Sequence, residues 1–200
     1  MSDRCAILLP AAGASRRMRG TDKLLQPVDG QPILRLVTQR ALQATPYVGV
    51  ALRPEHVERQ QALSGLPVII LPVKDASEGL AASLRAGASW ALAQNTEALM
   101  VALPDMPDIT ADDMRDLIAA QARQPNQPMR ASTVDGQPGH PVILPSALFP
   151  EMKNLVGDMG ARTLLGSHST GLHPLPGLRA VLDLDTPEQW ALWRKGQPRP

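Results

Sequence analysis

The residues most able to do chemistry are concentrated in one segment near the N-terminus, residues 9–24. Small residues there would let the backbone approach a phosphate closely, and successive backbone N–H groups can form a nest for an anion. These small residues are Ala11, Ala12, Gly13 and Ser15. Arg17 and Lys23 add two cations of the kind that bind polyphosphates. The segment therefore favours a phosphate site.

The segment matches neither common phosphate-loop pattern. Met18 stands where a Walker A loop needs its second glycine, and Ser15 interrupts the dinucleotide pattern G-x-G-x-x-G. A second interpretation therefore stays open, in which the segment is a flexible loop whose basic side chains are solvated.

Two carboxylates each follow an apolar run that is typical of a buried strand. Asp105 follows residues 98–103, and Asp185 follows residues 180–184. If both runs are strands of one sheet, the carboxylates converge at the edge that carries residues 9–24. Mg²⁺ is usually bound by one or two protein carboxylates together with phosphate oxygens. The spacing therefore indicates a possible magnesium site.

Helix capping is the alternative role for these carboxylates. Asp105 would cap the turn at Ile109, and Asp185 would cap a helix that begins at Pro187. Asp183 is a weaker metal candidate, because alternation along a strand would point it away from Asp185.

Two further segments offer groups for binding. Gly79 and Ser83 begin an expected helix and could reach a ribose or a base, although an ordinary helix start explains them equally well. His140 lies between Gly139 and Pro141 and could face an acceptor pocket, although a lone histidine is more often structural. The run 166–171 misses the nucleophile pattern G-x-S-x-G by one position, which argues against a serine hydrolase.

The elements that must position these groups alternate along the chain. Short apolar runs followed by longer amphipathic segments predict βαβ units and a mostly parallel sheet. The expected strands cover residues 5–9, 48–52, 67–71, 98–103, 129–134, 141–144 and 180–184. The expected helices cover residues 33–42, 54–63, 80–92, 157–165 and 187–193, with one more after Thr110. The first strand then leads into residues 9–24 at the carboxyl edge, where open α/β sheets bind ligands.

Composition limits the class of protein. The 200 residues include 20 Lys and Arg against 19 Asp and Glu, a balance that argues against a protein that coats nucleic acid or an anionic membrane. Three Trp, one Tyr and one Phe are too few for a base-stacking surface. With no linker or repeat, we expect one domain over residues 1–195 and a frayed tail over 196–200.

The composition also bears on cellular location. The single cysteine fits a reducing compartment. The apolar stretches are far shorter than the ~20 residues that a membrane-spanning helix needs. Residues 6–15 loosely mimic a signal-peptide core, but the charged segment before them is weak. We therefore expect a cytoplasmic protein.

The segment 9–24 resembles the signature loop of the MobA-like nucleotidyltransferases. It contains Leu-x-Ala-Ala-Gly-x-Ser-x-Arg-Met, followed by Gly and Asp-Lys-Leu. Five further segments agree with that family in order and spacing, so the resemblance spans residues 5 to about 190: Gly79–Leu84, Leu103–Pro107, Gly139–Val142, Gly157–Arg162 and Asp183–Glu188. The loop alone is shared with other nucleotidyltransferases. The segments at 139–142 and 157–162 are more specific to the molybdenum cofactor cytidylyltransferase branch.

Two departures from the family pattern concern the loop. Pro10 replaces the usual alanine, and Arg19 is inserted between Met18 and Gly20. The insertion puts the detailed contacts of the loop in doubt.

The resemblance implies a Rossmann-like nucleotidyltransferase fold, a mostly parallel mixed sheet flanked by helices. It also implies Mg²⁺-dependent transfer of CMP from CTP to the terminal phosphate of a molybdopterin-type acceptor, with release of pyrophosphate. Lys23, Arg17 and Asp105 would be catalytic, and Asp105 and Asp185 would hold the metal. The implied nucleotide-binding residues are Ala11, Ala12, Gly13, Ser15, Arg17, Lys23, Gly79, Ser83 and Asp105. The implied acceptor-binding residues are Gly139, His140, Asp158 and Arg162.

Other functions stay open at this point. The enzyme could use GTP, or could act on a sugar or polyol phosphate. Ala11 and Ala12 stand where the guanylyl branch resembles Gly-Gly, and their methyl groups favour a pyrimidine. The chain could instead be a non-catalytic accessory protein that delivers cofactor to a client molybdoenzyme. A pure carrier would not need Lys23 and the two carboxylates, Asp105 and Asp185.

Overall fold

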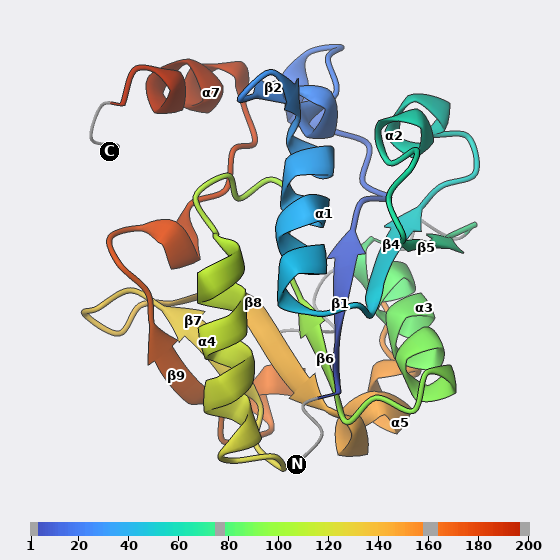
Figure 1. The fold of residues 1–200 in the computed structure, drawn as a ribbon, viewed down its shortest axis with the longest axis vertical. Helices are drawn as coiled ribbons and strands as arrows, with labels where there is room; N and C mark the ends of the chain where they lie inside the picture. The colour runs from blue at the N-terminus through green and yellow to red at the C-terminus, as the bar shows by residue number, and fades with distance from the viewer. Residues whose placement is uncertain (1–3, 75–78, 158–163, 197–200) are drawn as a thin grey trace.

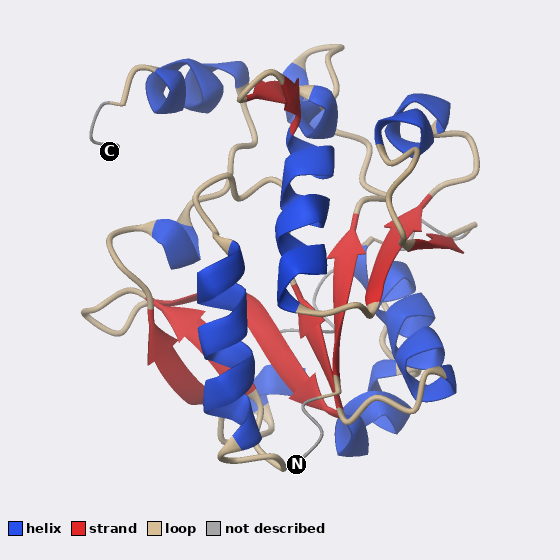
Figure 2. Cartoon of the chain, in the orientation of Figure 1, coloured by secondary structure: helices blue, strands red, loops and turns tan. Residues whose placement is uncertain are grey.

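A seven-stranded sheet with the strand order β5-β4-β1-β6-β8-β7-β9 organises the chain. The computed structural model describes residues 4–74, 79–157 and 164–196. The strands are β1 (Cys5–Pro10), β4 (Val48–Leu52), β5 (Ile69–Pro72), β6 (Ala98–Val101), β7 (Met129–Ser132), β8 (Pro138–Pro145) and β9 (Gly171–Pro174). β5, β4, β1 and β6 are parallel, whereas β8 runs antiparallel to both β6 and β7 (Figure 2). The expected mostly parallel mixed sheet is confirmed.

Helices cover both faces of this sheet. They are α1 (Ile33–Ala44), α2 (Val57–Ala62), α3 (Leu80–Ala93), α4 (Ala111–Ala122), α5 (Phe149–Met152) and α7 (Pro187–Arg194). α1 and α4 lie together on one face and α3 and α5 on the other (Figure 1). A small hairpin, β2 (Pro27–Val28) and β3 (Gln31–Pro32), lies near α7. No described helix is both long and apolar enough to cross a membrane.

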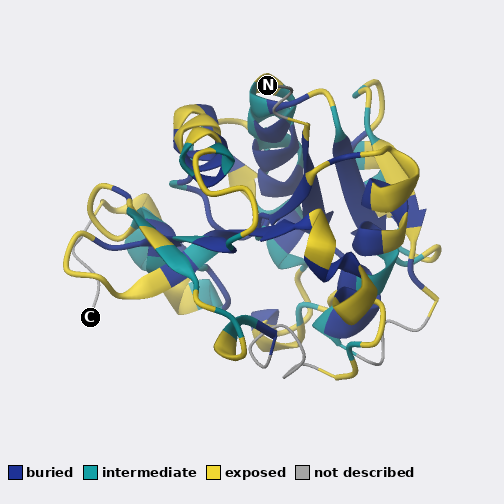
Figure 3. Ribbon diagram, turned by 90° about the horizontal axis from the view of Figure 1, so that it is seen from below, coloured by how far each residue is buried: buried dark blue, intermediate teal, exposed yellow. Residues whose placement is uncertain are grey.

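Strand β1 shows how one apolar run serves two cores. Ile7 and Leu9 belong to the cluster under α1 and α4, whereas Ala6 and Leu8 belong to the cluster under α3. All four are fully buried, as the uninterrupted apolar run predicts for a strand covered on both faces. The central strands are accordingly buried while the outer faces of the helices are exposed (Figure 3).

One expected strand is wrong. Residues 179–181 form a 3-10 turn, η5 (Arg179–Val181), and the chain beyond it is irregular up to α7. The turn packs against β8, where a Cβ on Gly139 would lie 1.8 Å from the Ala180 carbonyl oxygen. Ala180 and Leu184 are therefore buried against the sheet and not within it. The edge position beside β7 belongs to β9, which the sequence pattern did not indicate.

Two expectations fall partly outside the described residues. The helix expected over 157–165 includes residues 158–163, and the tail expected to fray includes residues 197–200. Three more 3-10 turns are η1 (Arg16–Met18), η2 (Lys23–Leu25) and η4 (Ser146–Leu148), and residues 164–166 are helical.

Candidate active site

The carboxyl edge of the parallel strands brings distant segments together. β1 ends at Pro10 and leads into the phosphate loop, by which we mean residues 11–22. Asp105 follows the neighbouring strand β6. The backbone N–H of Leu184 donates to the carbonyl of Asp105 at 3.0 Å, which fixes the segment that contains Asp185 beside it. The predicted convergence of the loop with Asp105 and Asp185 is present, although Asp185 does not end a strand.

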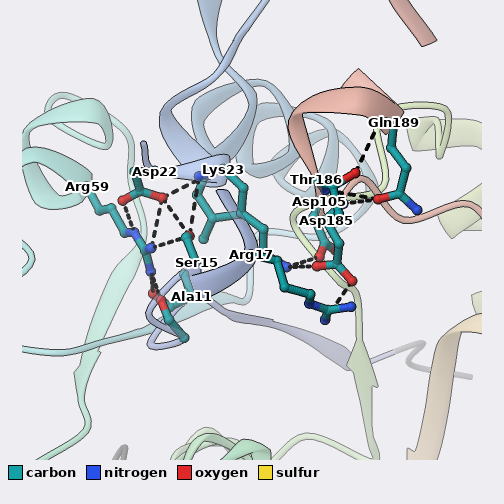
Figure 4. A network of polar contacts seen from close by, with 12 residues as sticks. Ala11, Ser15, Arg17, Asp22, Lys23, Arg59, Asp105, Asp185, Thr186 and Gln189 are labelled. Carbon is teal, nitrogen blue, oxygen red and sulfur yellow. Dashed lines mark hydrogen bonds and ion pairs between the residues drawn. The ribbon is translucent and has the colours of Figure 1, made fainter. Parts of the chain in front are cut away.

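Lys23 lies between the two carboxylates (Figure 4). Its Nζ is 2.5 Å from Oδ2 of Asp105 and 2.8 Å from Oδ1 of Asp185. Arg17 Nη2 pairs with the other Asp185 oxygen at 2.7 Å, and the Arg17 side chain is 71% exposed. Burial lowers the pKa of Lys23, but the charges of Asp105 and Asp185 outweigh burial and raise it. Burial likewise raises the pKa of Asp185, but Lys23 and Arg17 outweigh burial and lower it.

Neither carboxylate acts as a helix cap. The side chain of Thr110 caps α4 and that of Thr186 caps α7, each within a capping box. The carboxylates of Asp105 and Asp185 are therefore available for the cations of the site, which removes the capping alternative.

Asp183 is closer to the site than the sequence indicated. Carboxylate oxygens of Asp105, Asp183 and Asp185 all lie within 4.8 Å of one another. The alternation argument against Asp183 is wrong because this segment is not a strand. Burial, then the charges of Asp185 and Asp105, raise the pKa of Asp183. Among the described residues, no group donates a hydrogen bond to the buried Oδ1 of Asp105. Clustered oxygens, one of them unpaired, suit a hard divalent cation.

A cavity of about 230 Å³ adjoins Lys23 and Asp105. It is lined by Pro10, Ala12, Gly13, Lys23, Leu24, Gly79, Leu80, Ser83, Leu103, Pro104 and Asp105. Six of the nine residues expected to bind nucleotide are among them. A Cβ on Gly13 would have no atom within 4 Å, so the backbone there is open to a ligand. Ala11 is instead fully buried in the core, and the Ser15 hydroxyl bonds within the loop.

A second cavity of about 540 Å³ lies over β8 and shares the lining residue Leu80 with the first. Its lining is mostly apolar and includes Arg130 and His140. Burial, and then the charge of Arg130, lower the pKa of His140 to about 4. His140 Nδ1 is buried without a hydrogen-bond partner among the described residues. Gly139 packs against the backbone of Ala180, so its lack of a side chain has a structural reason.

Some groups lie outside this arrangement or were missed. Asp158 and Arg162 lie outside the described residues. A shallow cavity of about 590 Å³ between α1, α7 and η5 contains neither Lys23 nor its carboxylates. Sequence reasoning missed Arg130, which donates to the Gly139 carbonyl at 2.6 Å, and a buried arginine, Arg59. Arg130 could have been found as a charge within an otherwise apolar strand.

Comparison with known proteins identifies the family. Residues 6–187 match the model of the MobA-like NTP transferase domain. The chain belongs to this family. The resemblance to the MobA-like nucleotidyltransferases is therefore confirmed, and the protein is an enzyme of the nucleotidyltransferase class.

Relatives of this MobA-like chain differ in their names. The purine catabolism protein PucB of Bacillus subtilis is 30% identical over 198 residues, which cover 92% of this chain and 93% of PucB. A molybdenum cofactor guanylyltransferase of Rhodobacter capsulatus is 34% identical over 119 residues, which cover 58% of this chain and 59% of the relative.

Solved structures confirm the MobA-like fold. Rv0371c of Mycobacterium tuberculosis has a TM-score of 0.79 and 26% identity, and the match covers 96% of this chain and 98% of that one. Rv0371c was also solved in complex with manganese, in a structure that matches with a TM-score of 0.77 and 24% identity over 97% of this chain and all of that one.

Proposed function

We propose that this protein transfers CMP from CTP to the terminal phosphate of a molybdopterin-type acceptor, with Mg²⁺, and releases pyrophosphate. One observation carries the transfer chemistry: Lys23 Nζ is held by Asp105 and Asp185 at the wall of the 230 Å³ cavity. A cation and two carboxylates at the end of a phosphate loop suit the binding of a metal-bound triphosphate.

The reaction asks the protein for alignment and charge neutralisation. A phosphate acceptor is already an anionic nucleophile, so no general base is required. Lys23 and Arg17 would hold the triphosphate and stabilise charge on the leaving pyrophosphate. The raised pKa of Lys23 keeps its ammonium charged at neutral pH for this role. Asp105 and Asp185 would hold the divalent cation, which when bound neutralises charge on phosphate oxygens.

The preference for CTP is supported by the alanines at the start of the phosphate loop. Ala12 lines the 230 Å³ cavity together with Gly13, and we infer that its methyl group limits the space for a base. Ala11 is in the core, so only one of the two alanines that favoured a pyrimidine can act on the base directly. Guanylyl transfer to the same kind of acceptor is the second candidate, supported by the similarity to the Rhodobacter capsulatus enzyme.

The acceptor site is supported by the 540 Å³ cavity. An apolar lining with Arg130 and His140 suits a ring system that carries an anionic group. Because both cavities are lined by Leu80, an acceptor in the second would lie close to a nucleotide in the first. We therefore place Gly139 and His140 on the acceptor side, with Asp158 and Arg162 added from the family resemblance alone.

Turnover with different nucleotides tests the proposal. Purified protein is mixed with extracted molybdenum cofactor, Mg²⁺ and each of CTP, GTP, ATP and UTP, and pyrophosphate release is measured. We expect release with CTP above the other three. A preference for GTP would replace the cytidylyl assignment by the guanylyl one. Turnover with a sugar phosphate but not with molybdenum cofactor would overturn the acceptor.

Variants separate the acceptor side from the nucleotide side. His140→Ala and Arg162→Ala should weaken the use of molybdenum cofactor while leaving the affinity for CTP, measured by calorimetry, nearly unchanged. Equal losses in both measurements would place these residues in the nucleotide site or the core.

A further inference from the structure

Arg59 on helix α2 is buried beneath the phosphate loop, with its side chain 2% exposed. An arginine side chain carries five N–H donors, and each of these five has a partner here. Nε and one Nη2 hydrogen bind the two Asp22 carboxylate oxygens at 2.6 and 2.8 Å. The two Nη1 hydrogens bind the carbonyls of Ala11 and Gly13 at 2.5 and 2.8 Å. The other Nη2 hydrogen binds Oγ of Ser15 at 3.1 Å.

The arrangement requires a guanidinium at this position. A buried charge is costly unless it is paired and hydrogen-bonded, and Asp22 supplies the opposite charge in a bidentate pair. Burial opposes ionisation of Asp22, but the hydrogen bond and charge of Arg59 outweigh burial and lower the pKa of Asp22. A lysine would bring only three donors from a single atom, and it could not reach all five partners.

The guanidinium sets the direction of the loop amides. In a trans peptide the N–H points opposite to the C=O. Holding the carbonyls of Ala11 and Gly13 toward Arg59 therefore turns the N–H groups of Ala12 and Ala14 away from it. Arg53 Nε donates to the Ala12 carbonyl at 2.9 Å, and this contact turns the Gly13 N–H away from Arg53 in the same way. No residue in the described part of the chain accepts a hydrogen bond from these three N–H groups. They are available to a phosphate.

The same guanidinium also fixes the backbone at Lys23, through Asp22 and Ser15 (Figure 4). Asp22 Oδ1 accepts from the Leu24 N–H at 2.9 Å and so caps the turn η2, which begins at Lys23. Ser15 has the left-handed φ of 49° and accepts from the Lys23 N–H at 3.3 Å. Both ends of the phosphate loop thus depend on Arg59.

We propose that Arg59 is a positioning residue for the triphosphate. It holds the loop so that three amides and the Lys23 ammonium are directed to the phosphates, while its own donors are all occupied and its side chain is out of reach of a substrate. This inference rests on the proposed function, because it requires that the loop bind phosphate.

Binding of inorganic pyrophosphate with Mg²⁺ to the full chain tests the proposal without depending on base or acceptor. Calorimetry compares the wild type, Arg59→Lys and a control, Arg35→Lys. Arg35 also donates to carbonyls, those of Ala62 and Ser64, but outside the phosphate loop. We expect Arg59→Lys to raise the Kd at least tenfold and Arg35→Lys to change it less than twofold. In turnover, KM for the nucleotide should rise in Arg59→Lys while KM for the acceptor stays constant, a split that general loss of structure would not give.

The outcomes separate the two ideas. If the wild type binds pyrophosphate and Arg59→Lys binds it equally well, the inference is wrong and the proposed function stands. If the wild type neither binds pyrophosphate nor turns over any nucleotide, the proposed function fails and the inference fails with it. If Arg59→Lys does not fold, the Kd of Ser15→Ala for pyrophosphate tests the inference instead. This variant removes one partner of Arg59 and keeps the charges of Arg59 and Asp22. Its Kd should rise several-fold, and an unchanged Kd would overturn the inference.

Discussion

The two halves of the sheet organise their residues in different ways. In the parallel half, β5-β4-β1-β6, the loop after β1 is held by charged side chains that bind backbone and one another, as Arg59 binds Asp22. In the mixed half, β8-β7-β9, β8 is antiparallel to its neighbours while β7 and β9 are parallel, and the chain is held by close backbone packing, as where Gly139 meets Ala180. The first arrangement presents fixed charges and amides, which suit a triphosphate. The second leaves a mostly apolar cavity, which suits a larger and less charged molecule.

Removing a charge from the parallel half should have the largest effect. Asp105→Asn keeps the shape of the side chain but removes the charge that faces Lys23 and that would hold the proposed divalent cation. We expect turnover to fall by roughly 10²-fold or more, the usual effect of losing one electrostatic stabiliser. Pyrophosphate release under saturating nucleotide and Mg²⁺ measures this.

A matched control is Asp112→Asn, since Asp112 is an exposed carboxylate on α4 that pairs with Arg115. It should leave turnover unchanged. Near-normal turnover by folded Asp105→Asn would remove Asp105 from the metal site and weaken the contrast between the halves.

A change of packing in the mixed half should alter the stability of the protein. A Cβ at residue 139 would lie 1.8 Å from the Ala180 carbonyl oxygen, and backbone atoms cannot move aside cheaply. We expect Gly139→Ala to lower the free energy of unfolding by about 2–3 kcal/mol, as overpacking usually does. Urea unfolding measures it, with Gly166→Ala as the control because a Cβ there meets no atom within 4 Å. Equal stability of the two variants would contradict the packing role of Gly139.

The same contrast explains what could be predicted from the sequence. β1 and the loop after it depend on local pattern, so the apolar run, the small residues and Lys23 were all found. The run 180–184 was expected to be a strand, because a local apolar pattern cannot distinguish burial within a sheet from burial against it. That error also misplaced Asp183. Arg59 gave no local signal, since its partner Asp22 lies 37 residues away along the chain.

The partly buried His140 predicts a pH dependence specific to the mixed half. Its pKa is about 4 in the folded protein against an ordinary value of 6.5, mainly because of burial and then the charge of Arg130. The unfolded chain therefore binds a proton more readily, and stability is complete above pH 6.5 and decreases as the pH falls toward 4. Lowering the pH from 7 to 4.5 should reduce the free energy of unfolding by about 2 kcal/mol through His140, given ~1.4 kcal/mol for each unit of pKa.

His140→Gln should remove this part of the acid destabilisation, which urea unfolding at the two pH values measures. His173→Gln, on the edge strand β9, is the control and should lose stability as the wild type does. An equally steep loss in His140→Gln and in the wild type would contradict the prediction.

The smallest expected effect concerns the base and returns to the parallel half. Both alanines are buried, but Ala12 belongs to the cluster under α3 and lines the 230 Å³ cavity, whereas Ala11 belongs to the cluster under α1 and α4 and is not part of that lining. Ala12→Gly removes a methyl group from the wall and frees the backbone, so a larger purine should be accepted more easily. We expect the ratio of kcat/KM for GTP to that for CTP to rise by several-fold, which is less than the ~10- to 200-fold that one carbon can contribute in a well-formed binding pocket. Ala11→Gly should lower stability through the lost core methyl but leave this ratio unchanged. If both variants raise the ratio equally, backbone flexibility and not the shape of the cavity sets the choice of base.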